Sequence, residues 1–182
     1  ELNYSNLSIE VGVDYKTIQS WIGILQASYL VWLLPPYYRN FNKRVVKTPK
    51  LYFYDTGLAC SLLRISGPEL LGQHPFRGAL FENFVLNELL KKRFNQGQRS
   101  HLYFWRENSG REIDALLDEG LYPMPVEIKS GQTIASDWLK ALQYWGTLNP
   151  GYSGGIVYYG GEETQERSGG YQIRSWRTLA GD

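Results

Sequence analysis

Cysteine is nearly absent from this chain of 182 residues, which has a single one, Cys60. One cysteine forms no internal disulfide and no cysteine-based zinc site, which excludes disulfide-stabilised secreted folds and zinc fingers. Its apolar neighbours in GLACSLL indicate a small buried hydrophobic residue rather than a reactive thiol. We therefore expect a reducing compartment, the cytoplasm.

Long hydrophobic runs are missing as well. No stretch approaches the ~20 apolar residues that span a bilayer, so we expect no signal peptide and no membrane partner. The chain also lacks the G-x-x-x-x-G-K-[ST] phosphate loop and the G-x-G-x-x-G fingerprint, so we expect no ATP site within it. Because it begins with Glu1 rather than Met, we expect a fragment of a longer protein.

No charge of one sign dominates, since the formal net charge is +1. Residues 1–64 carry seven Lys and Arg against four Asp and Glu, and residues 65–182 carry twelve against fourteen. This mildly basic first third is compatible with a region that faces a polyanion and equally with random variation of the surface. An apolar fraction of 43% indicates a packed core rather than disorder.

Residues 1–60 have the pattern of a winged helix-turn-helix. A short helix over residues 4–11, a break at Gly12 and a second helix capped by Asp14 form a helix-turn-helix pattern. LVWLLPPYY and KLYFYD then predict two strands, which would form the wing. The alternative is that these elements only join or pack protein domains.

The winged-helix interpretation also names candidate nucleic-acid contacts. The second helix would expose Lys16 and Gln19, and the wing would carry Arg39, Lys43 and Arg44. Such side chains are suited to contact DNA phosphates and base edges.

Residues 61–182 predict an α/β domain around one mixed sheet. After a short helix at 56–65 and a Gly/Pro-rich loop at 66–75 comes the strongest helix of the chain, over residues 76–94. Strands are then predicted in SHLYFWRE, REIDALLDE and YPMPVEIKS, followed by a helix with Ser136 as its N-cap and by strands in GGIVYYG and YQIRSW. The order α-β-β-β-α-β-β is typical of a sheet flanked by helices.

Glu82 lies in the middle of the apolar face of the helix at 76–94. Five apolar residues lie within ~80° of Glu82, at ~100° per residue: Ala79, Val85, Leu86, Leu89 and Leu90. An unpaired carboxylate would be costly to bury there. We therefore expect a cation, a metal ion or hydrogen bonds to compensate Glu82.

Asp114 and Glu127 form a second acidic feature, with Gly120 almost midway between them. A hairpin turning near Gly120 would place the two acids opposite each other on antiparallel strands, with their Cβ atoms about 5 Å apart. The two prolines of YPMP predict a bulge or a longer loop in this hairpin. Lys129 follows Glu127 by two residues, so both side chains point to the same face of the strand.

Two carboxylates at that distance repel each other unless a cation lies between them. Together with a backbone carbonyl such as that of Ile128, they make a hard oxygen site suited to Mg²⁺ or Mn²⁺, which would polarise a phosphodiester. Lys129 would position or deprotonate a water molecule, or stabilise the developing negative charge. The catalytic candidates are therefore Glu82, Asp114, Glu127 and Lys129, of which the three acids are candidate metal ligands.

These residues carry a resemblance. Asp114, followed after a hairpin by Glu127-Ile128-Lys129, resembles the D…(D/E)-x-K signature of the restriction-endonuclease-like nucleases, and Glu82 is similar to the acidic residue on the preceding helix. YDTGLA, GALFENFV, REIDALL and VEIKSG resemble the C-terminal region of predicted AAA-superfamily ATPases of bacteria and archaea, over nearly all 182 residues. The resemblance implies an upstream ATPase, which would hold the ATP site, then a winged helix (1–60) and a nuclease-like domain of unknown function (61–182).

Two functions are therefore predicted as alternatives. The first is a metal-dependent nuclease that acts on DNA and works with the upstream ATPase in cis. The second is a non-catalytic DNA- or protein-binding module that regulates that ATPase. The site residues leave a further alternative open, in which Glu127 and Lys129 form a simple ion pair on an exposed sheet and Asp114 is an acid near a turn.

Overall fold

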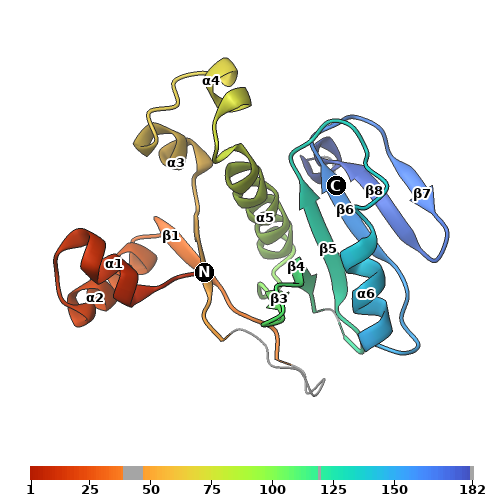
Figure 1. Ribbon diagram of the computed structural model, residues 1–182, viewed down its shortest axis with the longest axis horizontal. Coiled ribbons are helices and arrows are strands. Elements are labelled where there is room, and N and C mark those ends of the chain that lie inside the picture. The colour runs from red at the N-terminus through yellow and green to blue at the C-terminus, as the bar shows by residue number, and fades with distance from the viewer. Residues whose placement is uncertain (39–46, 119, 181–182) are drawn as a thin grey trace.

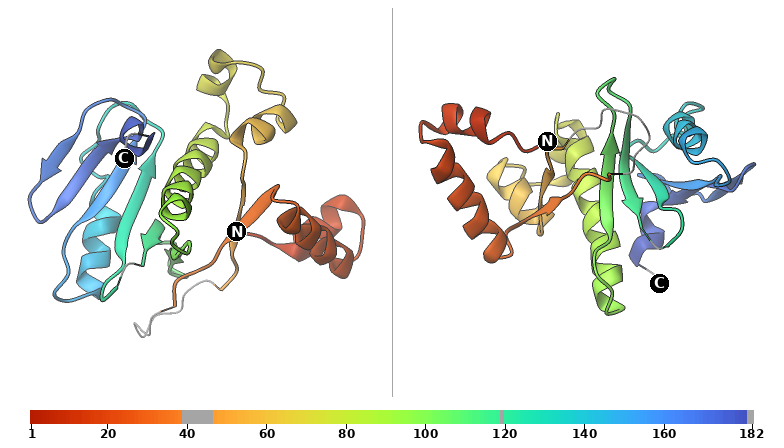
Figure 2. Two further views of the ribbon diagram at one scale, coloured as in Figure 1. Left: turned by 180° about the vertical axis from the view of Figure 1, so that it is seen from behind. Right: turned by 90° about the horizontal axis from the view of Figure 1, so that it is seen from below.

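The described residues 1–38, 47–118 and 120–180 form a series of layers in the computed structural model. Figure 1 shows a small N-terminal unit on the left, the long helix α5 (Arg77–Asn95) in the middle, and a β-sheet with the helix α6 (Lys140–Leu148) on the right. The right-hand view of Figure 2 shows α5 and α6 on opposite faces of the sheet. The predicted α/β class is thus confirmed.

The N-terminal unit consists of α1 (Tyr4–Val11), α2 (Tyr15–Ala27), β1 (Val31–Leu34) and β2 (Lys50–Phe53). Gly12 ends α1 in the left-handed conformation, with φ of 78°, which glycine adopts without steric cost. The Asp14 carboxylate caps α2 by accepting hydrogen bonds from the N–H groups of Lys16 and Thr17. Strands β1 and β2 pair antiparallel. These predicted elements are confirmed, and the domain boundary at residue 60 stays a prediction.

Two short helices, α3 (Thr56–Leu62) and α4 (Pro68–Gln73), connect the N-terminal unit to α5. The first was expected, and its Cys60 is half-buried rather than fully buried. The second corrects the prediction of a loop over residues 66–75. Proline at the first position of a helix is favourable because its fixed φ suits the helix and its missing N–H would be unpaired there anyway. The Gly67-Pro68 pair therefore starts a helix.

The sheet has the strand order β3-β4-β5-β6-β8-β7. Its strands are β3 (Leu102–Arg106), β4 (Glu112–Leu117), β5 (Met124–Lys129), β6 (Gly155–Tyr159), β7 (Gln165–Arg167) and β8 (Tyr171–Ser175). The pairs β5–β6 and β6–β8 are parallel and the others antiparallel, so the sheet is mixed as predicted. Strand β7 was not predicted, because this short edge strand has no buried residue to create an alternating pattern.

Apolar side chains cover both faces of the sheet. On one face, the buried side chains of α5 pack against β5 residues such as Val126 and Ile128. On the other face, Leu142 and Trp145 of α6 pack against Trp105. The buried residues of α5 include the predicted Val85, Leu86, Leu89 and Leu90, whereas Ala79 is exposed. None of the helices in the described part is both long enough and apolar enough to cross a membrane.

Helix α6 begins later than predicted. The residue before its first turn is Leu139, which makes no side-chain capping bond, so Ser136 is not the N-cap. The preceding residues form tight turns, in which the N–H groups of Trp138 and Lys140 donate to the carbonyls of Ala135 and Asp137, three residues back. Bonds of this spacing belong to turns and 3₁₀ geometry rather than to an α-helix. The helical pattern of the sequence therefore extends further than the α-helix.

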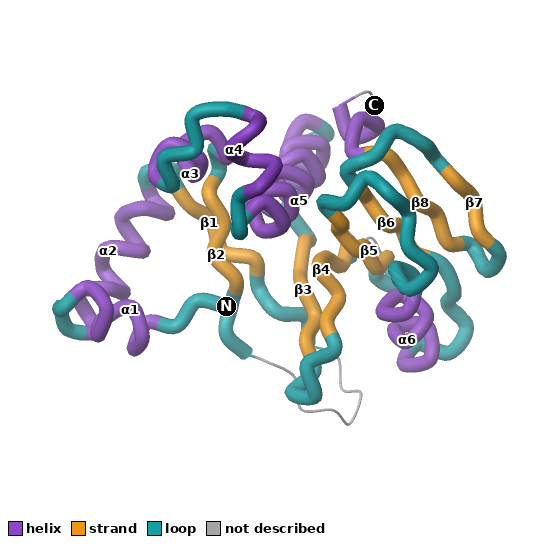
Figure 3. Tube along the Cα trace, turned by 45° about the horizontal axis from the view of Figure 1, so that its top comes forward, coloured by secondary structure: helices purple, strands orange, loops and turns teal. Residues whose placement is uncertain are grey.

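Two buried asparagines of α5 tie the N-terminal unit to the rest of the molecule. Asn83 accepts from the N–H of Phe53 (2.9 Å) and donates to the Phe53 carbonyl (2.7 Å). Asn87 donates to the carbonyls of Phe53 (2.9 Å) and Tyr54 (3.0 Å), and accepts from the indole N–H of Trp32 (2.9 Å). The side-chain amides of Asn83 and Asn87 thus make the hydrogen bonds that a neighbouring strand would otherwise make to the backbone of Phe53 and Tyr54. Figure 3 shows β1 and β2 between α2 and α5.

The chain that follows β1 provides a second link, at the edge strand β3. The N–H of Phe104 donates to the Pro35 carbonyl (3.0 Å), and the Phe104 carbonyl accepts from the N–H of Tyr37 (2.7 Å). These bonds form a parallel bridge at Pro36. They occupy part of the edge that β3 would otherwise present to solvent.

Replacing Asn83 or Asn87 by alanine is expected to lower the free energy of unfolding by about 1–3 kcal/mol each, because buried donors and acceptors lose their partners. Urea denaturation followed by circular dichroism measures the change. Asn95→Ala is the control, since Asn95 is exposed near the end of the same helix. If Asn83→Ala and Asn87→Ala were as stable as the control Asn95→Ala, the role given to the two buried asparagines would be contradicted.

Candidate active site

The β4–β5 pair brings the two predicted acids together. Its ladder ends at Ala115 opposite Val126, so Asp114 and Glu127 are the next residues along the two strands. Beyond this point the Ile128 N–H donates to Oδ2 of the Asp114 side chain, at 2.8 Å. The predicted juxtaposition across the hairpin is thus confirmed, at the position where regular pairing of the strands stops.

A β-bulge lies at the position of Asp114. The register of β4 against β3 shifts by one residue between Leu116 and Ile113. The extra residue is at Asp114 and Ala115, which together lie opposite Phe104. Because a bulge bends the strand and re-aims a side chain, it accounts for the contact of the Asp114 side chain with β5.

The bulge was expected in the β4–β5 hairpin, because of its prolines, and it lies in the β3–β4 pair instead. The hairpin has the longer loop that was the other expectation, between Leu117 and Met124. Pro125 pairs with Leu116 without a register shift. It lies near the start of its strand, where a missing N–H is tolerated.

Glu127 is buried, and only one of its two oxygens has a hydrogen-bond partner. Lys129 Nζ donates to Oε2 at 2.8 Å, which confirms the predicted pair on one face of the strand. Oε1 is buried and accepts no hydrogen bond. Since Glu127 is only 4% exposed, the interpretation of an ion pair on an exposed sheet is wrong. A buried carboxylate oxygen without a donor is costly, and a cation would satisfy it.

The pKa shifts of Asp114 and its neighbours also favour a cation at this site. The residue Asp114 as a whole is half-buried. Burial of its carboxyl group and the nearby Glu127 raise the pKa of Asp114 well above its usual range. Burial also raises the pKa of Glu127, against the opposing effect of Lys129. Burial favours the neutral form of Lys129, but Glu127 and Asp114 outweigh it and raise the Lys129 pKa. The site therefore holds two disfavoured carboxylates beside one firmly protonated lysine.

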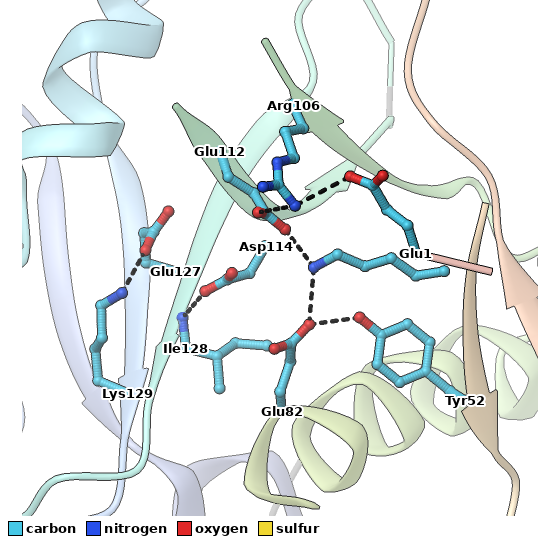
Figure 4. Close-up of polar contacts among 10 residues, drawn as sticks. Glu1, Tyr52, Glu82, Arg106, Glu112, Asp114, Glu127, Ile128 and Lys129 are labelled. Carbon is cyan, nitrogen blue, oxygen red and sulfur yellow. Dashed lines mark hydrogen bonds and ion pairs between the residues drawn. The ribbon is translucent and has the colours of Figure 1, made fainter. Parts of the chain in front are cut away.

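Glu82 lies on the other side of Asp114 from Glu127 and Lys129 (Figure 4). Its Oε1 accepts from Lys50 Nζ at 3.0 Å and from the Tyr52 hydroxyl. The expected compensation of Glu82 by a cation and a hydrogen bond is therefore confirmed.

Lys50, Tyr52 and Glu112 are neighbours of the site that the sequence analysis missed. Lys50 Nζ also forms an ion pair with Glu112 Oε1, and Arg106 pairs with Glu112 and with Glu1. One signal was available in the sequence, since Lys50 and Tyr52 alternate in KLYFYD as Glu127 and Lys129 do in VEIKSG. That alternation does not reveal which side chain Lys50 meets.

The acids of the site do not form a three-ligand cage. Among the residues that the structure describes, no three His, Cys, Asp or Glu side chains gather closely enough to hold one metal ion. Asp114 and Glu127 are the pair that would contact an ion. The role of Glu82 as a third ligand stays a prediction, because its carboxylate is bound to Lys50 and Tyr52.

The candidate nucleic-acid contacts are only partly covered by the structure. Lys16 and Gln19 lie exposed on α2, as predicted, and Gln19 donates to the Tyr15 hydroxyl at 3.3 Å. Arg39, Lys43 and Arg44 lie outside the described residues. The DNA contacts therefore stay a prediction for all five side chains.

Fold and site define a mixed α/β protein with an acidic pair and a lysine where two antiparallel strands part. The chain belongs to the family described as Domain of unknown function (DUF4143), which residues 77–179 match. Residues 1–69 match a second family, Domain of unknown function (DUF8612).

Two mycobacterial proteins are similar to the chain. Uncharacterized protein Rv2008c of Mycobacterium tuberculosis and Uncharacterized protein Mb2031c of Mycobacterium bovis are each 31% identical to it over 129 residues, 71% of this chain. The matched region covers 28% of the length of each relative. No solved structure matches the chain.

Asp114→Asn is expected to raise the free energy of unfolding by about 1 kcal/mol in buffer without divalent ions. The amide oxygen still accepts from the Ile128 N–H, while the charge that Glu127 repels is removed. Urea denaturation in the presence of EDTA measures the effect, with the exposed Asp137→Asn as the control. A loss of stability in Asp114→Asn would show that the site is not electrostatically strained.

Proposed function

We propose that Asp114, Glu127 and Lys129 form the active site of a nuclease that hydrolyses phosphodiester bonds in DNA with Mg²⁺ or Mn²⁺. One observation carries this proposal: the buried Oε1 of Glu127 has no donor, although it lies beside a second carboxylate and a lysine. Evolved structures keep such costly arrangements mainly at functional sites.

The residues fit a divalent ion. Carboxylate oxygens of Asp114 and Glu127 would hold it, and hard oxygen ligands are the ones that Mg²⁺ and Mn²⁺ prefer. When bound, the ion supplies a Lewis acid for the phosphodiester. The Ile128 N–H fixes Oδ2 of Asp114 at 2.8 Å, so the backbone of β5 sets the orientation of this carboxylate.

Lys129 has an electrostatic role in this proposal. Its raised pKa keeps the ammonium protonated at neutral pH, which makes it a poor base. A fixed positive charge beside the reacting phosphate stabilises the negative charge that develops in the transition state. Of the roles expected for Lys129, charge stabilisation is therefore the one we retain, and deprotonation of water is not.

The proposal includes the wider organisation inferred from the resemblance. Residues 61–182 would have the restriction-endonuclease-like fold, for which the order of α5, β3, β4 and β5 before α6 is suitable. Residues 1–60 would be a winged helix that contacts DNA, and an AAA-type ATPase would act upstream in cis.

Lys129→Ala is expected to reduce cleavage of DNA at least about 100-fold, because the transition state loses its fixed positive charge. The assay incubates the protein with supercoiled, linear, branched and single-stranded DNA in Mg²⁺ or Mn²⁺. Lys140→Ala is the matched control, since Lys140 is exposed on α6. Cleavage that survives unchanged in Lys129→Ala would not arise from this site, and the nuclease proposal would fail.

A second candidate function is a binding module without catalysis. It is favoured by apolar side chains on the surface of the N-terminal unit, where Ile9 is 79%, Trp21 47% and Ile24 58% exposed. Exposed apolar residues of this kind are typical of protein contact surfaces. In this candidate, Glu127 and Asp114 hold a metal ion for structure only, and the N-terminal unit contacts the ATPase or DNA.

If the N-terminal unit binds DNA, replacing Lys43 and Arg44 by alanine should weaken binding and lower its dependence on salt, because fewer phosphates are neutralised. Fluorescence anisotropy with a labelled duplex at several salt concentrations measures both quantities. Trp21→Ser is the control that removes an exposed apolar side chain and no charge. No binding at low salt would refute the DNA contact and leave the protein contact.

A further inference from the structure

Lys50 reaches into the acidic site from a different part of the chain. It is the first residue of β2 in the N-terminal unit, whereas Glu82 belongs to α5 and Glu112 to β4. Lys50 Nζ lies 3.0 Å from Glu82 Oε1 and contacts Glu112 Oε1 at the same time. We call Lys50, Tyr52, Glu82 and Glu112 the Lys50 cluster.

The ammonium group of Lys50 is well enclosed. Its side chain is 13% exposed, and the aromatic ring of Phe104 lies 5.3 Å from Nζ. Burial disfavours the charged form, but Glu82 and Glu112 outweigh it and raise the pKa of Lys50. Tyr52 adds a hydroxyl donor to the same Glu82 oxygen. Lys50 is therefore a protonated ammonium group held between two carboxylates.

Asp114 couples the Lys50 cluster to the proposed metal pair. Its charge interacts with Glu127 and Lys129 on one side and with Glu82 and Lys50 on the other. A positive charge on Lys50 repels a divalent ion bound to Asp114, and it also offsets the negative charge of Glu82 and Glu112 that would attract the ion. Lys50 thus opposes metal binding in two ways.

We propose that Lys50 is a built-in counter-cation that competes with a divalent ion for the negative charge around Asp114, so that the docking of β2 on α5 sets the metal affinity of the site. The inference rests on the proposed function, because the ion in question is the one proposed for Asp114 and Glu127. Tyr52 assists by holding the same oxygen of Glu82. Removal of the lysine charge leaves the negative charges of Glu82 and Glu112 less compensated, which favours a divalent ion nearby.

The test is a titration of the protein with Mn²⁺, with free Mn²⁺ measured by electron paramagnetic resonance. Lys50→Met is expected to bind Mn²⁺ about tenfold more tightly than the wild type, since one nearby positive charge is lost. Lys47→Met is the matched control, because Lys47 is an exposed lysine of the same segment, and its affinity should stay within about twofold. Glu82→Gln in the Lys50→Met background should reverse the gain.

Unchanged or weaker Mn²⁺ binding by Lys50→Met would overturn the inference, since it would mean that Lys50 supports the site or is irrelevant to it. Glu127→Gln separates this failure from a failure of the proposed function. If the wild type binds Mn²⁺, Glu127→Gln does not, and Lys50→Met binds no more tightly than the wild type, only the inference fails. If neither wild type nor Lys50→Met binds Mn²⁺, both fail.

Thermal unfolding gives a second readout without titration of the ion. Lys50→Met should unfold at a lower temperature than the wild type in EDTA, and Mn²⁺ should raise its unfolding temperature more than that of the wild type. Lys50→Gln, whose amide still donates to Glu82 and Glu112, is the substitute if Lys50→Met does not fold. An equal or smaller Mn²⁺-induced shift in these variants would contradict competition by Lys50.

Discussion

The hydrogen bonds from Asn83 and Asn87 to the end of β2 are the constraint on which the Lys50 cluster depends. They bind the backbone of Phe53 in both directions, so β2 has one fixed position on α5. In this position Lys50, three residues earlier, reaches Glu82. The N-terminal unit therefore contributes side chains to a site whose other members come from α5 and the sheet.

The carboxylates around this contact are compensated in two different ways. Glu82 and Glu112 share a lysine from elsewhere in the chain, and Glu112 also pairs with Arg106. Glu127 has Lys129 on one oxygen and no partner on the other, next to Asp114. The first arrangement gives each carboxylate a cationic partner, whereas the second leaves one buried carboxylate oxygen without a donor. The imbalance is confined to the place where the bulge in β4 turns Asp114 toward β5.

The sequence predicts the second arrangement better than the first. Asp114, Glu127 and Lys129 lie on one hairpin, so a period of two residues and a central glycine are enough to bring them together. Lys50 meets Glu82 across 32 residues, through a strand held by asparagines, and no local pattern contains that information. Prediction from the sequence also failed at Pro68, where the preference of proline for the first helical position was not applied, and at Ser136, which lies in a turn rather than at a helix cap.

The most direct test of the account is the anomalous difference map of crystals soaked in Mn²⁺. The account predicts a peak in contact with carboxylate oxygens of Asp114 and Glu127, including Oε1 of Glu127. The absence of a peak at saturating Mn²⁺, or a protein group that donates a hydrogen bond to Oε1, would contradict it. Either result would mean that the buried oxygen of Glu127 does not mark a metal site.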